Sequence, residues 1–455
     1  MKRDKRSIQA IGILTITLTA LLLLLPMPNA EAVIDGLTGN SFNLKAKADH
    51  ISTPIGGSLL IWGYANGDDR AQYPGPTLIL NQGETITVNL TNELDIDQDG
   101  DDIPDMNVSI VFPGQENVVA CGGTSGLLTR EATFGGTVSY TFTATHAGTY
   151  LYHSGTSPEI QVEMGLLGAI IVRPSGFNPD ATRAYNHPDA AYDHEYLFLL
   201  SEMDPRIHET VEFCGVAALK DTDFLSDYFP NYWFINGRNA PDTMLMAYVP
   251  WLPTQPYNCM PRMHPGERLL MRVIGAGRDL HPFHFHGNHA RIIAKDGRLL
   301  ESSPGLGADL SYELFTIQSI PGETVDAIFE WTGKGLGWDI YGHEGAEPGI
   351  CEGYIPGDLA TFFDPVTKEY CPDHGKPFPV SLPEELDLTF GRFYSGSPFL
   401  GTLGNLPPGE GGVNPTGGFV FMWHSHTEKE MTNYNIYPGG MMTMLIIEPP
   451  DVPIP

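Results

Sequence analysis

The stretch "NQGETITVNLTN" (Asn81–Asn92) decides the fold, because the chain uses its pattern a second time. A glycine-containing turn leads into alternating apolar and polar residues, which is typical of a β-strand with one buried face. "HPGERLLMRVIG" (His264–Gly275) repeats both the turn and the strand. Self-similarity of this kind indicates two copies of one structural unit.

Further pairs of segments align in the same order along the chain. They are "SIVFPG" (109–114) with "PFHFHG" (282–287), "GTYLYHSG" (148–155) with "FVFMWHSH" (419–426), and "GLLGAIIVRP" (165–174) with "GGMMTMLIIEP" (439–449). Two strand-rich units predict an all-β fold of two tandem Greek-key β-sandwiches. We expect the first domain at residues 33–180 and the second at 181–455, the second with a large loop insertion at about 333–418, which is rich in glycine and proline.

The net charge of −30 narrows the choice of partners. Nucleic acids and anionic membrane surfaces would both be repelled by such a chain, so neither is expected as a partner. The charge fits a secreted, soluble protein.

The N-terminus has the pattern of a secretory signal. Basic residues are followed by the apolar run Ile8–Leu25 and by small residues at Ala30 and Ala32. We predict a signal peptide at residues 1–32 and therefore a secreted or periplasmic protein with no membrane contact after cleavage. An uncleaved membrane anchor is the alternative, because the run is about long enough to span a bilayer.

Export would allow disulfides, and the chain has five cysteines. Cys351 with Cys371 and Cys214 with Cys259 are the pairs that we consider, which would leave Cys121 free. The spacing leaves other pairings open.

Histidines gather at two places in the second copy. The first group lies within nine residues and consists of His281, His284, His286 and His289; the second consists of His424 and His426, at the equivalent of His153 in the first copy. Residues two apart on a strand face the same side, so each group can direct imidazoles toward one metal ion. The alternative is that these are core or surface histidines on aromatic-rich strands.

The motifs together resemble a known family. "YPGPTLILNQGETITVNLTN" (73–92), "GTYLYHSG" (148–155), "HPFHFHGNHARIIAKDG" (281–297) and "WHSHTEKE" (423–430) with "GGMMTMLI" (439–446) are similar to the landmark regions of multicopper oxidases, laccase-like proteins built of cupredoxin domains. The similarity covers nearly all of the expected mature chain except the insertion. The arrangement resembles the two-domain members, which implies a homotrimer with copper between subunits.

The resemblance implies an oxidoreductase that uses copper. In this family a blue copper ion accepts electrons from a small-molecule or metal-ion substrate, and a trinuclear copper cluster passes them to O₂. By matching motif positions, His281 would be a blue-copper ligand. The cluster ligands would be His153, His284, His286, His424 and His426.

Several family positions carry other residues here. Val111–Gly114 replaces the motif His-x-His-Gly, and Gly155 stands at another histidine position. Ser425 stands where the family has the blue-copper cysteine, Glu430 where it has the second histidine, and Met441 matches the axial ligand. A blue site needs a thiolate with two imidazoles, so we expect no blue copper.

Two hypotheses follow. In the first, the protein is a secreted oxidoreductase that uses a non-blue copper held by the remaining histidines, with Glu430 and Met441 as weaker ligand candidates. In the second, it is a non-catalytic extracellular protein that binds metal or serves a structural role. Met441 also lies in a methionine-rich strand, where methionine is more commonly a core residue.

The stretch "DIDQDGDDIPD" (95–105) suggests a second metal. Asp95, Asp97 and Asp99 alternate before Gly100, as in the opening of a calcium loop, with Asp101 or Asp105 to complete the ligand set. The twelfth position is not the glutamate of an EF-hand, so we predict a short extracellular type of calcium loop. The alternative is a solvated acidic turn.

Overall fold

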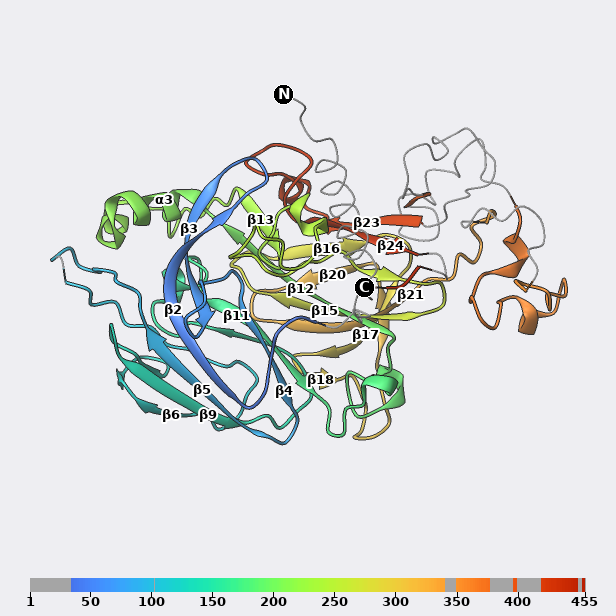
Figure 1. The fold of residues 1–455 in the computed structure, drawn as a ribbon, viewed down its shortest axis with the longest axis horizontal. Coiled ribbons are helices and arrows are strands. Elements are labelled where there is room, and N and C mark those ends of the chain that lie inside the picture. The colour runs from blue at the N-terminus through green and yellow to red at the C-terminus, as the bar shows by residue number, and fades with distance from the viewer. Residues whose placement is uncertain are drawn as a thin grey trace, which may run out of the picture.

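The computed structural model describes residues 34–101, 103–339, 349–376, 396–398, 419–448 and 452–454. The predicted signal peptide and much of the predicted insertion lie outside these residues. The described chain is almost entirely strands and connecting loops (Figure 1), which confirms the predicted all-β class. None of the helices in the described ranges combines the length and apolar composition needed to cross a bilayer.

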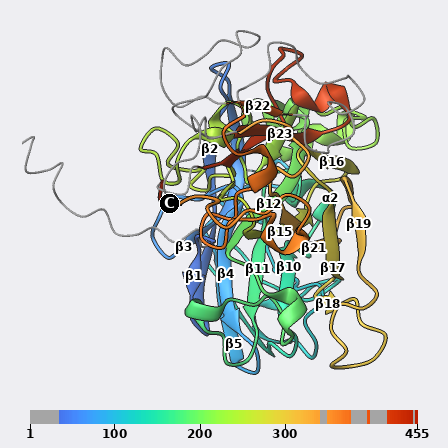
Figure 2. The same cartoon turned by 90° about the vertical axis from the view of Figure 1, so that its right-hand side faces the viewer.

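The first sandwich is built from two sheets. One sheet has the order β1 (Leu37–Thr38), β4 (Gly75–Asn81), β11 (Leu167–Arg173), β10 (Gly148–His153), and the other has the order β3 (Ser58–Asn66), β2 (Ser41–Ser52), β5 (Thr85–Asn92), β9 (Thr137–Thr143), β6 (Val119–Gly122). A small hairpin joins β7 (Thr124–Ser125) to β8 (Arg130–Glu131). Figure 2 shows β4, β11 and β10 side by side.

The second sandwich also has two sheets. One contains β13 (Tyr232–Ile235), β12 (His194–Met203), β15 (Arg268–Gly275), β21 (Thr324–Glu330), β17 (Ala290–Lys295) and β18 (Arg298–Leu299), with β19 (Tyr312–Leu314) beside β17. The other contains β14 (Arg262–Met263), β24 (Met442–Ile447), β23 (Phe419–Ser425), β16 (His281–Phe285) and β20 (Thr316–Ser319), with β22 (Gly396–Pro398) beside β23.

Short helices connect the strands. The α-helices are α2 (Pro158–Gln161) and α3 (Pro205–Cys214). The 3-10 turns are η1 (Pro179–Ala181), η2 (Pro188–Ala190), η3 (Val216–Asp221), η4 (Asp242–Met244), η5 (Leu359–Thr361), η6 (Cys371–Asp373) and η7 (Glu428–Met431).

The strand pairing reproduces the repeat seen in the sequence. In the first sandwich β5 runs parallel to β2 and antiparallel to β9, while β11 runs antiparallel to β10 and parallel to β4. In the second, β15 runs parallel to β12 and antiparallel to β21, while β24 runs antiparallel to β23 and parallel to β14. The repeated segments 81–92 and 264–275, which contain β5 and β15, therefore occupy equivalent places in the two sandwiches.

The two sandwiches share a buried interface. Each has its own core, and a third apolar cluster joins the outer face of the β4–β11–β10 sheet to β12 and β13. Tyr73 of the first sandwich, for example, packs edge-on against Phe234 and donates a hydrogen bond to Ser201 at 2.6 Å. The sandwiches are thus fixed against each other by the same apolar packing that builds each core.

Charged residues are also buried in this interface. Glu195 accepts hydrogen bonds from Arg173 and Arg272, and Asp326 accepts one from Thr149 at 2.6 Å. Burial alone would raise the pKa of Glu195, but the two guanidinium groups lower it to about 2. Buried charges persist when they are paired and hydrogen-bonded, as they are here.

The cysteines confirm one predicted pair and correct the other. Cys351 and Cys371 form a disulfide within the described part of the insertion. Cys214 and Cys259 are both free: Cys214 is exposed at the end of α3, whereas Cys259 is buried in the core of the second sandwich. Because they lie in such different surroundings, the pair that we considered from spacing is wrong.

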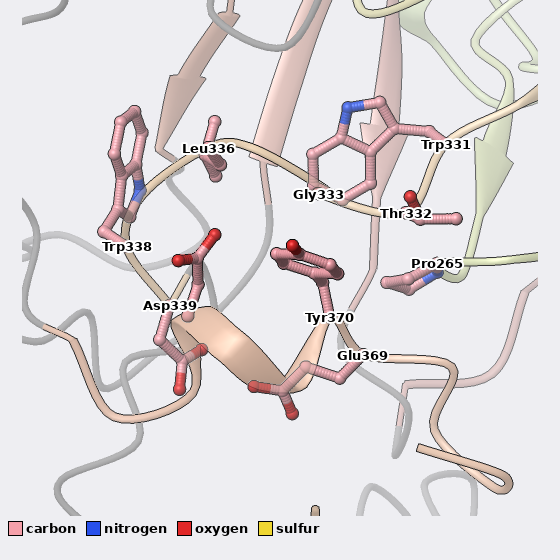
Figure 3. Close-up of a pocket in the computed structure, with 10 residues that line it drawn as sticks. Pro265, Trp331, Thr332, Gly333, Leu336, Trp338, Asp339, Glu369 and Tyr370 are labelled. Atoms are coloured by element: carbon pink, nitrogen blue, oxygen red, sulfur yellow. The ribbon is translucent and has the colours of Figure 1, made fainter. Parts of the chain in front are cut away.

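The described part of the insertion packs against the second sandwich around a small pocket. Figure 3 shows the ring of Tyr370 below Trp331, with Trp338 and Asp339 on the other side. Asp339 accepts a hydrogen bond from the backbone of Gly375 at 3.0 Å. The Asp339 carboxylate therefore joins the segment before residue 340 to the segment around residue 375.

Candidate metal centre

The histidine groups lie on two neighbouring strands, β16 and β23. These strands pair antiparallel in a register that places His284 directly opposite His424. The backbone N–H of His286 donates to Met422, and that of His426 donates to Pro282. Side chains two apart share a face, so all the histidines named here lie on the same side of the sheet, as the spacing predicted.

The residues between the histidines point the other way. Phe283, Phe285 and Trp423 belong to the core of the second sandwich and are fully buried. Phe283 and Trp423 meet edge-on at 6.5 Å between ring centroids. This apolar inner face fixes the register, because a slip by one residue would bring the histidines into the core.

The outer face brings the imidazoles together. The ring centroid of His284 lies 4.8 Å from that of His286, 5.5 Å from that of His424 and 5.0 Å from that of His426. The Nε2 atoms of His424 and His286 are 3.2 Å apart. One ligand nitrogen from each of His284, His286 and His424 lies within 4.8 Å of the others, a separation that one metal ion can bridge.

Hydrogen bonds fix which nitrogen faces the centre. The Nδ1–H of His284 donates to the Phe315 carbonyl at 2.7 Å, with the Thr316 hydroxyl at 2.9 Å. The Nδ1–H of His424 donates to the Ser425 carbonyl at 2.7 Å. In both rings Nε2 is left as the electron-pair donor, the arrangement commonly seen in metal-binding histidines.

His284 and His424 stay neutral down to acidic pH. Burial, together with His286 and His424, lowers the pKa of His284 to about 3. Burial also lowers the pKa of His424 to about 4, with His286 and His426 adding to the effect. Neutral imidazole is the form that binds a metal, so these two ligands need lose no proton near pH 7.

His153 lies in the first sandwich, at the end of β10. Its backbone bridges to Val111, and its Nδ1 contacts the Ser154 carbonyl at 2.8 Å. Burial lowers the pKa of His153. The three histidines whose ligand nitrogens lie within 4.8 Å of one another in the described residues do not include His153.

The first sandwich is closely packed around the positions where histidines are replaced. Phe112, which lies between the replaced positions Val111 and Pro113, is buried against Tyr140 and Phe142, at 5.6 Å and 5.0 Å between ring centroids. A Cβ atom at Gly155 would lie 2.7 Å from the Cγ1 of Val111, closer than such atoms approach. This place in the first sandwich therefore has no room for a side chain at residue 155.

The inner face carries a different set of groups around His281. The Nε2 of His281 contacts Glu202 at 2.8 Å and its Nδ1 contacts Glu430 at 2.8 Å, and all three side chains are buried. Both ring nitrogens face carboxylates, so both carry protons and His281 is an imidazolium ion. Burial alone would lower the pKa of His281, but the two carboxylates raise it to about 10.

This arrangement brings His281 and Glu430 together as an ion pair. Ser425 is fully buried on the same inner face, and its hydroxyl accepts a hydrogen bond from the Thr427 backbone at 3.2 Å. Met441 is fully buried in the apolar core of the second sandwich. An imidazolium has no free electron pair for a metal, so in this state His281 is not a ligand.

Glu202 was not anticipated from the sequence. It lies at the end of β12 and also accepts backbone hydrogen bonds from Arg278 at 2.6 Å and Asp279 at 2.9 Å. The sequence does contain one signal for it: Glu202 is the single acidic residue in the apolar run "YLFLLSEM" (196–203). A carboxylate in a buried strand needs a charged or hydrogen-bonding partner, so this position indicates a buried polar contact.

The acidic loop brings together part of the predicted calcium set. Carboxylate oxygens of Asp97, Asp99 and Asp101 lie within 4.8 Å of one another, while Asp95 lies outside this group. Asp97 accepts hydrogen bonds from the backbone of Asp99 and Gly100, at 3.1 Å and 2.6 Å. Asp105 accepts one from Gln98 at 2.8 Å, which closes the loop from its other end.

Comparison with known proteins supports the fold and the family. Residues 69–176 match the family described as multicopper oxidase. Laccase 1 of Metarhizium robertsii is 31% identical over 144 residues, which are 30% of this chain and 21% of that protein. An L-ascorbate oxidase of Cucurbita pepo var. melopepo is 32% identical over 135 residues, 29% of this chain and 21% of that protein. The match thus spans about a fifth of the length of these curated relatives.

Solved structures resemble most of the chain in fold. A blue copper oxidase from Nitrosomonas europaea has a TM-score of 0.51 at 19% identity, covering 89% of this chain and 85% of that one. The multicopper oxidase mgLAC has a TM-score of 0.52 at 18% identity, covering 91% and 87%. The fold is therefore of the cupredoxin type found in copper oxidases. Residues 69–176 are thus similar in sequence to multicopper oxidases, and the chain resembles such proteins in fold.

Proposed function

We propose that this protein is a secreted, copper-dependent oxidoreductase that uses a non-blue, histidine-ligated copper site, with O₂ as the electron acceptor. The observation that supports this most strongly is the set of imidazoles on the outer face of β16 and β23. His284 and His424 are opposite each other, and each directs Nε2 toward the same centre. The substrate would be a small molecule or a metal ion.

The side chains present fit copper. Imidazole nitrogens suit Cu²⁺, and neutral rings held by carbonyl groups bind without prior loss of a proton. His284, His286 and His424 would hold the ion, and His426, whose ring lies 5.6 Å from that of His424, would add a further ligand. When bound, copper would supply the one-electron chemistry that the side chains of this site lack.

The inner face supports the non-blue assignment. Ser425 offers no thiolate, and His281 is held between Glu202 and Glu430. A blue site requires a thiolate with two neutral imidazoles, and none of these conditions is met by this set. We therefore propose that electrons enter directly at the outer-face site.

His153 motivates the proposed oligomer. It lies at the end of β10 and outside the cluster of its own chain. In a homotrimer, His153 of the first sandwich of one subunit would complete the outer-face site of the next. Sedimentation analysis of the secreted protein would test this, and a monomer at working concentration would remove His153 from the proposed ligand set.

Metal analysis tests the central proposal. The secreted protein would be loaded with Cu²⁺, desalted, and examined by mass spectrometry and EPR. We expect retained copper with a non-blue EPR signal and no intense visible band, and loss of that copper in His284→Ala/His424→Ala. His146→Ala, at an exposed histidine far from β16, is the matched control. Copper that is not retained, or is retained equally by the double variant, contradicts the proposal.

Oxygen uptake tests catalysis separately from binding. Copper-loaded protein would be supplied with phenols, Fe²⁺ or Mn²⁺ while O₂ consumption is recorded. We expect uptake that depends on copper and is lost in His284→Ala/His424→Ala. Retained copper without uptake on any of these substrates would favour the second candidate, a non-catalytic extracellular protein. The packing at Gly155 and Val111 favours that candidate, because it removes histidine positions from the first sandwich.

We also propose that the acidic loop binds Ca²⁺ through Asp97, Asp99 and Asp101, with Asp105 closing the loop. The support is the convergence of the three carboxylates within 4.8 Å. Oxygen ligands of this kind suit Ca²⁺, with affinities near millimolar in extracellular modules. Calorimetry should detect binding that is lost in Asp97→Asn/Asp99→Asn. No heat with millimolar Ca²⁺ would leave the loop as a solvated acidic turn.

A further inference from the structure

Two histidines and a glutamate meet at the start of the second sandwich, away from β16 and β23. His194 begins β12, His264 follows β14, and Glu267 precedes β15. The Nε2 of His194 lies 2.8 Å from Glu267 Oε2, and the Nδ1 of His264 lies 3.0 Å from Glu267 Oε1. One ligand atom from each of the three lies within 4.8 Å of the other two.

The surroundings of His264 specify what must lie between it and Glu267. Its Nε2 is 2.8 Å from the Val452 carbonyl, which can only accept, so Nε2 carries the proton. A neutral His264 would then direct the electron pair of Nδ1 at the negatively charged Glu267. That contact is favourable only if a positive charge lies between them, either a second proton on the ring or a metal ion.

The first copy of the repeat offers an internal comparison. The equivalent turn there begins at Asn81 and ends at Glu84, with the backbone N–H of Glu84 donating to Asn81 at 3.2 Å; the matching bond from Glu267 to His264 is 3.3 Å. In the first copy the amide of Asn81 donates to the Glu84 carboxylate at 3.3 Å. The same turn is thus closed without any imidazole, so histidine is not needed for the turn itself.

We propose that His194, His264 and Glu267 form a second metal site, separate from the copper centre, that takes Zn²⁺ with water as a further ligand. Two imidazole nitrogens with one carboxylate oxygen are a common zinc ligand set. A metal-binding histidine usually donates its other ring N–H to a carbonyl or carboxylate, as His264 does to Val452. Bonds of about 2.0–2.1 Å separate tetrahedral ligands by about 3.3 Å, so only a small opening of the trio is required.

Access and charge both favour a cation at this place. The three side chains keep between 14% and 26% of their surface exposed, so an ion can reach them from solvent. The nearest arginines are already paired: Arg262 with Glu448 at 3.0 Å and Arg268 with Glu330 at 3.2 Å.

The ion would connect parts of the chain that are distant in sequence. It would tie the strand that follows the link between the sandwiches, β12, to the turn between β14 and β15. Through the bond from His264 to Val452 it would also hold the segment near the C-terminus. The site therefore acts as a structural clip rather than as a place for catalysis.

Zinc binding should be measured in the variant His284→Ala/His424→Ala, which removes the copper centre as a competing site. After loading with Zn²⁺ and desalting, we expect about one zinc per chain and a raised melting temperature. His264→Asn, added to this variant, gives the turn the same asparagine–glutamate pair as the first copy. It should abolish both the retention of zinc and the rise in melting temperature. His194→Gln, tested in the same way, should also lose the metal.

X-ray absorption at the zinc edge would identify the ligands. Nitrogen and oxygen neighbours at about 2.0–2.1 Å are expected. The proposal is overturned if the variant His284→Ala/His424→Ala retains no zinc. His194, His264 and Glu267 would then be held together by hydrogen bonds with a proton, not a metal ion, between His264 and Glu267. It is also overturned if His264→Asn, shown by circular dichroism to be folded, retains as much zinc as the background protein.

Discussion

At the scale of single residues, the inner face shows how a buried histidine can be made permanently cationic. His281 has a carboxylate on each ring nitrogen, and water is excluded from all three groups. The ordinary pKa of histidine is 6.5, whereas that of His281 is raised to about 10 by Glu202 and Glu430 against the opposing effect of burial. Its charge state thus does not change across the physiological range.

The raised pKa of His281 predicts alkaline sensitivity. A group whose pKa is higher in the folded state stabilises that state fully below its unfolded pKa and loses this contribution as pH rises toward its folded pKa. The free energy of unfolding should therefore fall between pH 6.5 and about 10. Denaturant titrations at a series of pH values would measure it.

Glu202→Gln is the matching substitution. Removing one partner of a buried ion pair costs roughly 3–5 kcal/mol, and we expect a loss near the lower end because glutamine keeps the shape and an acceptor. The alkaline decline should also shift to lower pH. An unchanged pH profile in this variant would show that His281 is not the titrating group.

Gly155 predicts a steric effect. A Cβ atom there would lie 2.7 Å from Cγ1 of Val111 and 3.2 Å from the hydroxyl of Ser109. Gly155→Ala should destabilise the protein by about 1–3 kcal/mol, the usual cost of overpacking. Val111→Ala removes the clashing methyl, so the double variant should recover part of the loss. If the two effects simply add in thermal melts, the contact with Val111 is not the cause.

At the scale of elements, the alternation of β16 and β23 was readable from the sequence. Period two predicted that His284 and His286 share a face, as do His424 and His426, and the register places them together. The role of His281 was not readable, because its partner Glu202 is 79 residues away along the chain. Position in a motif does not reveal what a neighbouring strand brings to it.

The failures at the other elements have the same physical origin. Cys214 and Cys259 were considered as a pair from spacing, but Cys214 is exposed at the end of α3 and Cys259 lies in a core. The lack of room for a side chain at Gly155 depends on the backbone β-bridge between Val111 and His153. No local sequence pattern specifies that bridge. Local periodicity predicts which way a side chain points; contacts between distant segments decide what it meets.

The strand β20 predicts a graded effect on the proposed copper site. Thr316 supplies a hydroxyl 2.9 Å from the Nδ1 of His284, beside the Phe315 carbonyl. Substituting groups that orient a ligand typically costs ~10–100-fold in metal affinity, and the remaining carbonyl should limit the loss for Thr316→Val to about tenfold. Copper titration by calorimetry would measure it, with Thr85→Val, at an exposed position of β5, as the control.

At the scale of the whole molecule, the two sandwiches are joined by apolar packing around a buried charge network. Arg173 comes from the first sandwich, and Glu195, Arg272 and Asp326 come from the second. All four side chains are nearly inaccessible to solvent. The network therefore specifies which faces of the sandwiches meet, since an offset would leave charges buried without partners.

Glu195 makes this interface sensitive to acid. Its pKa is lowered from 4.5 to about 2, so its contribution is present above pH 4.5 and is lost as pH falls toward 2. Glu195→Gln should reduce the free energy of unfolding by about 3 kcal/mol at neutral pH, because two guanidinium groups lose their partner.

The same variant should also show a weaker decline in stability between pH 4.5 and 2, because the titrating group is gone. Glu209→Gln, at an exposed position of α3, is the control. Equal acid profiles for the parent and Glu195→Gln would assign the acid transition to other carboxylates.

The pleat of β23 has one more consequence. His424 and Ser425 are adjacent in sequence, yet one belongs to the outer cluster and the other to the interior, so a single peptide bond separates two chemical environments. The sheet therefore acts as a partition, and each compartment can be rewritten by substitution without disturbing the other. A protein engineer could therefore alter the ion pair on one side and leave the histidine cluster on the other side unchanged.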